Sequence, residues 1–279
     1  MTERLRFART TTGAVGLTLL VVVLGIALFG PFFAPHSPDA PIGVPLSGPG
    51  DGAPFGTDFL GRDVLSRVLW GGRSVLALAG LATLLAYAGG ITIGLVAGYS
   101  RSLVDPILMR SADVLLAFPP LLFLLVLITG AGASKAVLVI GVALVQLPPI
   151  ARIVRTATLE QSVRGFVEAA VARGERTGAI LRREILPNIV GPLMADVGLR
   201  FTYCIILVAS VNFLGLGLQP PDADWALIIS ENRGGLTLNP YVILVPATLI
   251  GLLTISVNLV GDAVARSLGF STARKVMVR

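Results

Sequence analysis

Few of the 279 residues combine the types and spacing that enzyme chemistry needs. A serine or cysteine nucleophile requires a base within hydrogen-bonding reach, yet the chain has one histidine, His36, and one cysteine, Cys204, which lies in an apolar run. His36 also lacks the second histidine or cysteine that a metal site would use. No Gly-x-x-x-x-Gly-Lys-Ser/Thr string is present to cradle nucleotide phosphates. We therefore expect no catalytic residue, no metal ligand and no cofactor in this chain.

A second group of polar residues suits a different chemistry, because these residues stand inside long apolar runs. Amides and hydroxyls in such runs either bond to a neighbouring helix or line a route for a polar solute. The candidates for a passage are Gln146, Thr202, Ser210 and Asn212. The charged residues fall near the expected ends of the runs: Asp113, Asp196, Arg200 and Asp262. An ion-coupled secondary transporter, which usually places ionisable groups at mid-depth, is therefore the less favoured alternative.

The composition indicates a membrane protein. Hydrophobic residues make up 54% of the chain and charged residues 14%, with a mean hydropathy of +0.84, which leaves too few polar groups to cover a soluble surface. A bilayer core of about 30 Å requires about 20 apolar residues in a helix. Six runs approximately meet this requirement, at 13–34, 74–98, 112–130, 134–151, 196–218 and 240–262. We therefore expect an all-α membrane protein with six transmembrane helices, some of them interrupted by Pro119, Pro120, Pro148, Pro149 and Pro246.

The cationic residues orient these spans. Of the 22 Lys and Arg residues, 17 lie in or beside the segments at the two termini and those that follow the second and fourth spans, whereas 5 lie on the opposite side. Cations in short loops are retained on the cytoplasmic side. Both termini are therefore expected in the cytoplasm, an N-in and C-in topology. This topology accounts for the net charge of +6, and no nucleic-acid partner is expected, because no aromatic residues are interleaved with the cations.

The longest cytoplasmic loop, at 152–193, contains the string FVEAAVARGERTGAILRREILPN. Its apolar residues recur at helical spacing, at Val163, Phe166, Val167, Ala170 and Val171. This pattern predicts a short amphipathic helix that ends near Gly174, where a left-handed residue costs little. A second helical piece is expected from about Gly178 and should stop before Pro187, because the residue before proline is disfavoured in the α region. These two short helices could bind a partner protein, or their arginines could hold them on anionic lipid headgroups.

The string resembles the EAA signature of the permease subunits of importer-type ABC transporters. The matching residues are Glu168-Ala169-Ala170, Gly174 and Leu186-Pro187. The resemblance implies that the loop forms a coupling helix, which docks into a cleft on a cytoplasmic ATPase. The coupling residues would be Phe166, Glu168, Ala169, Ala170, Gly174, Leu186 and Pro187. One departure is Glu184, which stands where the family has Ile.

Two further strings resemble the C-type permease subunit of dipeptide and oligopeptide importers. They are PFGTDFLGRDVLSRVLWGGRSVL, at 54–76, and NFLGLGLQPPDADW, at 212–225. The first predicts an interfacial helix on the outer face, capped by Asp58 or Asp63. The chain then divides into 1–73, with the first span, the extracytoplasmic segment and this helix, and 74–279, the core permease domain with the coupling loop. Val208 stands where an acidic residue is common in the family. The transported cargo could therefore differ from an ordinary peptide.

The resemblance implies a type I ABC importer permease fold and a multi-pass location in the bacterial inner (plasma) membrane. The implied partners are the lipid bilayer, a homologous B-type permease subunit, one or two ABC ATPase subunits that hold ATP and Mg²⁺, and an extracytoplasmic substrate-binding protein. The implied cargo is a dipeptide or oligopeptide, with haem or a chelated metal such as nickel as alternatives within the family.

Cysteine labelling tests the expected topology. In a Cys204→Ala background, Ser47→Cys should react with a membrane-impermeant thiol reagent in intact cells, because residue 47 belongs to an outer segment. Thr177→Cys should react only after the membrane is opened. The reverse labelling pattern would contradict the six-span topology.

Overall fold

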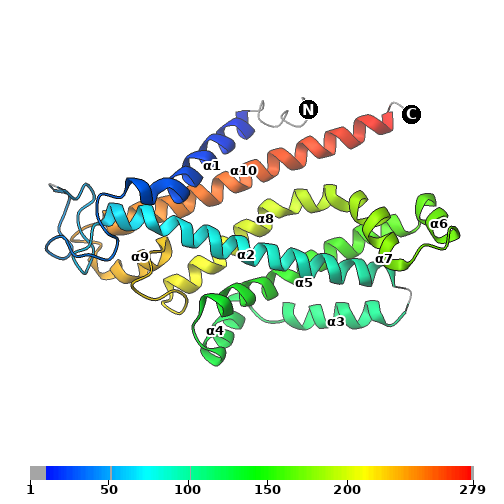
Figure 1. Ribbon diagram of the computed structural model, residues 1–279, viewed down its shortest axis with the longest axis horizontal. Coiled ribbons are helices and arrows are strands. Elements are labelled where there is room, and N and C mark those ends of the chain that lie inside the picture. Colours follow the sequence, from blue (N-terminus) through cyan, green and yellow to red (C-terminus); the bar gives the residue numbers. More distant parts are fainter. Residues whose placement is uncertain (1–10, 51, 101, 278–279) are drawn as a thin grey trace.

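The computed structural model describes residues 11–50, 52–100 and 102–277. In this part of the chain the secondary structure is helical, apart from isolated bridges such as Pro41 with Arg62. Most of the long helices run along the long axis of the molecule (Figure 1). Residues 34–63 form a cap at one end together with α9 (Trp225–Asn232), whereas α6 (Gly165–Ala172) lies at the opposite end.

Six membrane-crossing units account for most of the chain. The other elements, in chain order, are α1 (Thr11–Phe29), η2 (Gly30–Phe33), α2 (Val64–Tyr99), α3 (Val104–Leu116), α4 (Pro120–Ala131), α5 (Lys135–Ser162), α7 (Thr177–Ala179), η3 (Ile180–Ile185), α8 (Leu186–Phe213), η4 (Arg233–Gly235) and α10 (Tyr241–Met277). Five units are long and apolar enough to cross a bilayer alone: Thr11–Phe33, Val64–Tyr99, Lys135–Ser162, Thr177–Phe213 and Tyr241–Val264. The pair α3 and α4 supplies the sixth, which confirms the expected all-α, six-span fold.

The third span is not the single helix expected at 112–130. Helices α3 and α4 meet at 87° across a break at residues 117–119. Pro119 has an extended ψ of 126°, and Pro120 begins α4. Two successive prolines remove two backbone donors and disfavour the α conformation of the residue before each of them, so the helix ends and restarts in a new direction.

The other prolines do not break their helices, contrary to expectation. Pro148 and Pro149 lie inside α5, and Pro246 lies inside α10. Helix α5 is held along its length by α2, with which it makes the most extensive interface of the bundle. The approach is close, since a Cβ atom on Gly94 would lie 2.5 Å from Cβ of Val154. This packing keeps α5 helical through its two prolines.

The predicted interfacial helix is the beginning of α2 rather than a separate element. Asp63 caps α2, with Oδ1 accepting from Leu65 N (3.3 Å) and Oδ2 from Ser66 N (3.1 Å). From there the helix runs without interruption to Tyr99, so residue 73 lies inside it. The side chain of Trp70 is 39% exposed near this outer end, where an aromatic ring suits the level of the lipid headgroups.

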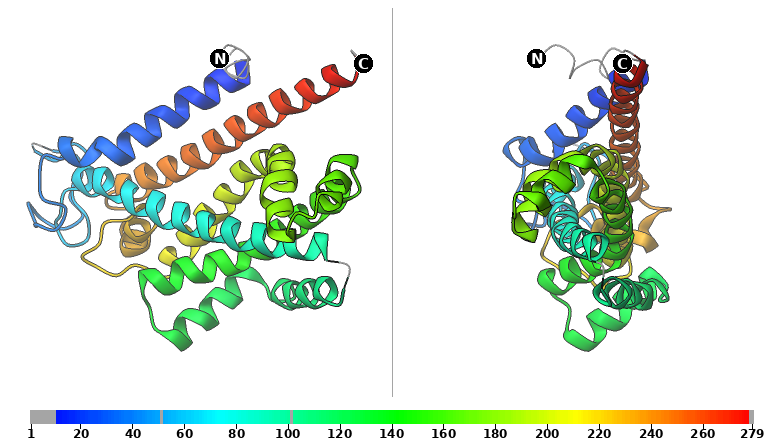
Figure 2. Two further views of the ribbon diagram at one scale, coloured as in Figure 1. Left: turned by 45° about the vertical axis from the view of Figure 1, so that its right-hand side comes forward. Right: turned by 90° about the vertical axis from the view of Figure 1, so that its right-hand side faces the viewer.

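Helices α1 and α10 run side by side at one edge of the bundle (Figures 1 and 2). Gly16 permits their contact, because a Cβ atom there would lie 2.6 Å from Cβ of Leu259. At the outer end of α1, Arg73 of α2 donates to the carbonyl oxygen of Leu28 from Nε (3.1 Å) and Nη2 (2.7 Å). The far ends of α1 and α10 both point away from the cap, in agreement with an N-in and C-in chain. The cations that lie outside the described residues are Arg4, Arg6, Arg9, Arg101 and Arg279.

Four buried charged side chains tie the cap to the bundle. Asp58 Oδ2 accepts from Arg62 Nε (2.6 Å) and from Arg67 Nη1 (2.8 Å). Both arginines also contact Glu231 Oε2 of α9, at 3.2 Å from Arg62 Nη2 and 2.9 Å from Arg67 Nη2. Burial raises the pKa of Glu231 to about 7, while Arg62 lowers that pKa and Asp58 raises it. Asp58, which contacts both arginines at 2.6 and 2.8 Å, is their nearest counter-charge.

We expect Asp58→Asn to destabilise the protein by about 3–5 kcal/mol, because it leaves two buried arginines without their nearest counter-charge. The thermal unfolding of the detergent-purified protein measures this effect. A matched control is Asp222→Asn, which removes an exposed pair with Lys135 and should cost less than about 1 kcal/mol. Equal unfolding temperatures for the two variants would show that the buried cluster does not secure the cap.

Candidate coupling surface and passage residues

One face of α6 is fixed to the start of the α8 helical run. Val167 and Ala170 are buried in a cluster with Ile180 and Ile185 of η3 and with Ile189 of α8. These apolar contacts hold α6 against the end of a membrane-crossing helix.

The opposite face of α6 is exposed and carries the remaining signature residues. Phe166, Glu168, Ala169 and Val171 are all solvent-accessible, so the predicted apolar face is buried only at Val167 and Ala170. The Glu168 carboxylate makes no ion pair with Arg164 among the described residues, although its backbone N donates to Arg164 O (3.2 Å). The exposed signature residues of α6 therefore include a phenyl ring and a carboxylate that has no ion-pair partner among the described residues, on a surface that the subunit itself does not cover.

Gly174 makes the corner after α6, as expected. Its φ is +76°, in the left-handed region, and its backbone N donates to Val171 O (2.9 Å). A Cβ atom added there would meet nothing within 4 Å. Glycine is therefore favoured at residue 174 because of the left-handed backbone conformation, and not because a larger side chain would lack space.

The helical piece after the corner does not stop before Pro187. It begins with α7, passes through the π-helical turn η3 and continues as α8, in which Pro187 occupies the first turn. Leu186 keeps helical angles (φ −54°, ψ −44°) despite preceding a proline. The wider π turn changes the hydrogen-bonding register, and Asn188 Nδ2 donates to the carbonyl oxygen of Glu184 (2.6 Å). The run from Thr177 to Phe213 is therefore one continuous helical element.

Arg173 connects the corner to this element. Its Nη2 lies 2.6 Å from Glu175 Oε1 and 3.6 Å from Glu184 Oε1. Glu184, the position at which the sequence departs from the family pattern, thus replaces an apolar contact by an ion pair. The sequence analysis did not anticipate this pair, because its partners lie in different helical segments.

The four passage candidates do not form one exposed surface. Gln146 of α5 and Thr202 and Asn212 of α8 are buried, and Asn212 Oδ1 accepts from Leu218 N (3.0 Å). Ser210 is partly exposed, and its hydroxyl donates to Ile206 O (2.7 Å). In this conformation the first three face other helices of the same subunit.

An ion pair that the sequence analysis placed near a span end lies in the middle of α8. Arg200 Nε donates to Asp196 Oδ1 (3.1 Å) and Oδ2 (3.0 Å). The hydroxyl of Tyr87 on α2 also donates to Asp196 (2.9 Å), and Arg200 Nη1 lies 3.5 Å from Gln146 Oε1 on α5. Helix α8 begins at Leu186, ten residues before the predicted span. The spacing of Asp196 and Arg200, four residues apart, was the available signal.

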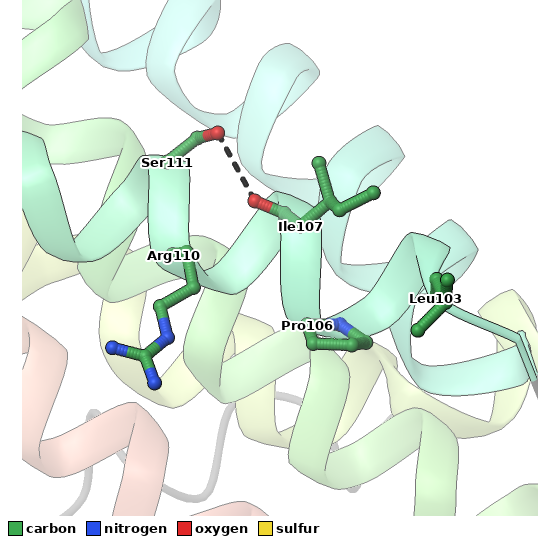
Figure 3. A pocket seen from close by; sticks show the side chains of 5 residues that line it. All are labelled: Leu103, Pro106, Ile107, Arg110 and Ser111. Carbon is green, nitrogen blue, oxygen red and sulfur yellow. Dashed lines mark hydrogen bonds between the residues drawn. The ribbon is translucent and has the colours of Figure 1, made fainter.

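A shallow groove lies on the outer face of α3 (Figure 3). Leu103, Pro106, Ile107, Arg110 and Ser111 line it, and the Ser111 hydroxyl donates to Ile107 O (3.0 Å). Leu103 directly precedes α3 and the other four residues belong to that helix, so other helices do not enclose this surface. It contributes no polar cluster to the passage.

Comparisons with known proteins identify the family. The model described as "Binding-protein-dependent transport system inner membrane component" matches residues 90–273. The chain belongs to this family. The "N-terminal TM domain of oligopeptide transport permease C" matches residues 4–48 of the permease, the region that contains α1. The permease is accordingly a multi-pass component of the bacterial inner membrane.

Individual relatives resemble this permease over nearly its whole length. A "Glutathione transport system permease protein" from Pectobacterium atrosepticum is 33% identical, covering 94% of this chain and 88% of its own. A "Di/tripeptide transport system permease protein" from Pseudomonas aeruginosa is also 33% identical, covering 94% and 89%. A "Dipeptide transport system permease protein" from Alkalihalophilus pseudofirmus is 32% identical, covering 91% and 84%.

A solved structure supports the fold. A chain of the MetNI methionine ABC transporter in an inward-facing conformation aligns with a TM-score of 0.58 and 19% identity, covering 74% of the permease and 96% of that chain. The permease therefore has the type I ABC importer permease fold.

We expect Gly174→Val to disrupt the corner, because a β-branched residue in the left-handed region costs roughly 1–2 kcal/mol. The spans should still insert, while transport and co-purification of the ATPase should fall to near background. Gly178→Val is the matched control, since Gly178 also has open space around it but does not have a positive φ. Normal transport by Gly174→Val would show that the left-handed corner is dispensable.

Proposed function

We propose that this permease forms half of the passage of an ATP-driven importer of dipeptides and oligopeptides. A homologous B-type permease would supply the other half, one or two ABC ATPase subunits would bind below, and an extracytoplasmic substrate-binding protein would deliver cargo at the cap. ATP and Mg²⁺ would be held by the ATPase, so this subunit is not itself an enzyme. The proposal rests on one observation. The subunit leaves one face of α6 uncovered, while the opposite face packs on η3, which is continuous with α8.

Coupling follows from the way that α6 is attached. Phe166, Glu168 and Ala169 would enter a cleft on the ATPase, because they are the exposed signature residues. ATP-driven closure of the ATPase would then displace α6. Since α6 packs on η3, and η3 is continuous with α8, the displacement would tilt a membrane-crossing helix and open the passage alternately to the two sides.

The relatives favour a peptide cargo over haem or a chelated metal. Their names specify glutathione, dipeptides and di/tripeptides, which are all short peptides. These relatives cover most of the permease, including the buried cap and the coupling loop. A short peptide is therefore the cargo class that we propose.

We propose that the passage runs along a partly exposed stripe of α8. The stripe recurs every three or four residues and consists of Leu199, Tyr203, Ile206, Ser210 and Phe213. Ser210 and the Tyr203 hydroxyl supply its polar groups. Gln146, Thr202 and Asn212 would reach cargo only when α8 changes its packing, as a change between inward and outward states requires.

Glu168→Ala tests the coupling role. The carboxylate has no partner within the described part of the subunit, so a change confined to this chain should have little effect on folding. If Glu168 binds the ATPase, uptake in proteoliposomes should fall about tenfold or more, the equivalent of about 1.4 kcal/mol.

Glu160→Ala is the matched control, because Glu160 is also exposed at the cytoplasmic end of α5 but lies outside the signature. The control should transport at the normal rate. Equal, near-normal uptake by both variants would favour a loop that rests on lipid and would remove the coupling role.

A further inference from the structure

The Asp196–Arg200 pair lies halfway along α8. Arg200 is 13 residues from Phe213 at the outer end of α8, about 20 Å at 1.5 Å per residue, and 23 residues from Thr177 at the start of the continuous helical run. Two other ion pairs differ from it, since Arg67 with Asp58 lies near the start of α2 and Arg152 with Asp113 is about half exposed. Charged groups inside a membrane span are costly and usually mark the route of a substrate.

The hydrogen bonds of this cluster leave one edge of the guanidinium free. Asp196 accepts from Arg200 Nε and from the Tyr87 hydroxyl. Arg200 Nη1 makes only the long contact with Gln146, and no partner of Nη2 is found in the described part of the chain. Arg200 remains 15% exposed, compared with 10% for Asp196. The arginine is therefore held from one side and open on the other.

Arg200 itself lies next to the exposed stripe of α8 along the helix. Tyr203 stands one helical turn after Arg200 and is 47% exposed, so the two residues are neighbours on the helix surface. A guanidinium with free donors binds a carboxylate through two parallel hydrogen bonds. A peptide with a free C-terminus carries such a carboxylate, which needs a counter-charge inside an apolar bundle.

We propose that Arg200 binds the terminal carboxylate of the cargo inside the membrane-spanning part of α8. Asp196 and Tyr87 are positioning residues, which hold the guanidinium so that its outer edge faces the passage. This inference rests on the proposed peptide cargo and adds a requirement for a negatively charged end. Gln146, which is weakly bonded to Arg200, is the group that cargo displaces.

The test compares a dipeptide with its C-terminal amide in proteoliposomes that contain the whole transporter. Both cargoes are supplied at concentrations that saturate the binding protein, with binding measured separately, so that rates after delivery are compared. The wild-type transporter should prefer the free carboxylate, and Arg200→Met should reduce this preference tenfold or more. Arg200→Lys keeps the charge but loses the bidentate geometry, and should retain only part of the preference.

Arg152→Met is the control, because it removes the arginine of an exposed pair between α5 and Asp113 of α3. It should leave the ratio of the two rates unchanged. If the transport rates of both cargoes fall by the same factor in the Arg200 variants, Arg200 has a structural role and the inference is overturned. The proposed peptide import would not be affected by that result. A wild-type transporter that imports neither cargo would instead overturn the proposed function, and the inference with it.

Discussion

The permease depends on one mechanical constraint, the helical continuity from Thr177 to Phe213. A flexible joint between the cytoplasmic loop and α8 would absorb any displacement of α6 before it reached the membrane. The π turn at 180–185 instead carries the helix through Pro187, and Ile180 and Ile185 of that turn are buried against Val167 and Ala170. The loop and the span would then move together, as the proposed coupling role requires.

The distribution of charge follows from the same membrane environment. In the described part of the chain, ion pairs gather in the cap, where Asp58 neutralises two arginines, and between α3 and α5, where Arg152 pairs with Asp113 and Arg155 with Asp105. The Asp196–Arg200 pair differs from those between α3 and α5, since its two side chains are mostly buried and lie halfway along α8. An apolar pair would pack there without the cost of desolvating two charges. The charged cargo proposed above would account for the pair at this point of the span.

Much of this architecture could be predicted from local chemistry. Apolar length identified the spans, Asp63 was recognised as a possible cap, and Gly174 was recognised as a left-handed corner. Features that depend on packing could not be predicted in this way. Proline has the same intrinsic effect at 119 and at 148, yet only the former ends a helix, because α5 packs along α2 and α3 bends away. The burial of Gln146 likewise reflects the arrangement of three helices, which no local pattern contains.

The contact between α6 and the ATPase is the central claim, and photo-crosslinking in the assembled transporter tests it most directly. A photoreactive phenylalanine analogue at Phe166, which is exposed on α6, should form a covalent product with the mass of the permease plus one ATPase subunit. The same analogue at Val44, which is exposed in the cap, should form none. Crosslinking at Phe166 to lipid alone would contradict the account.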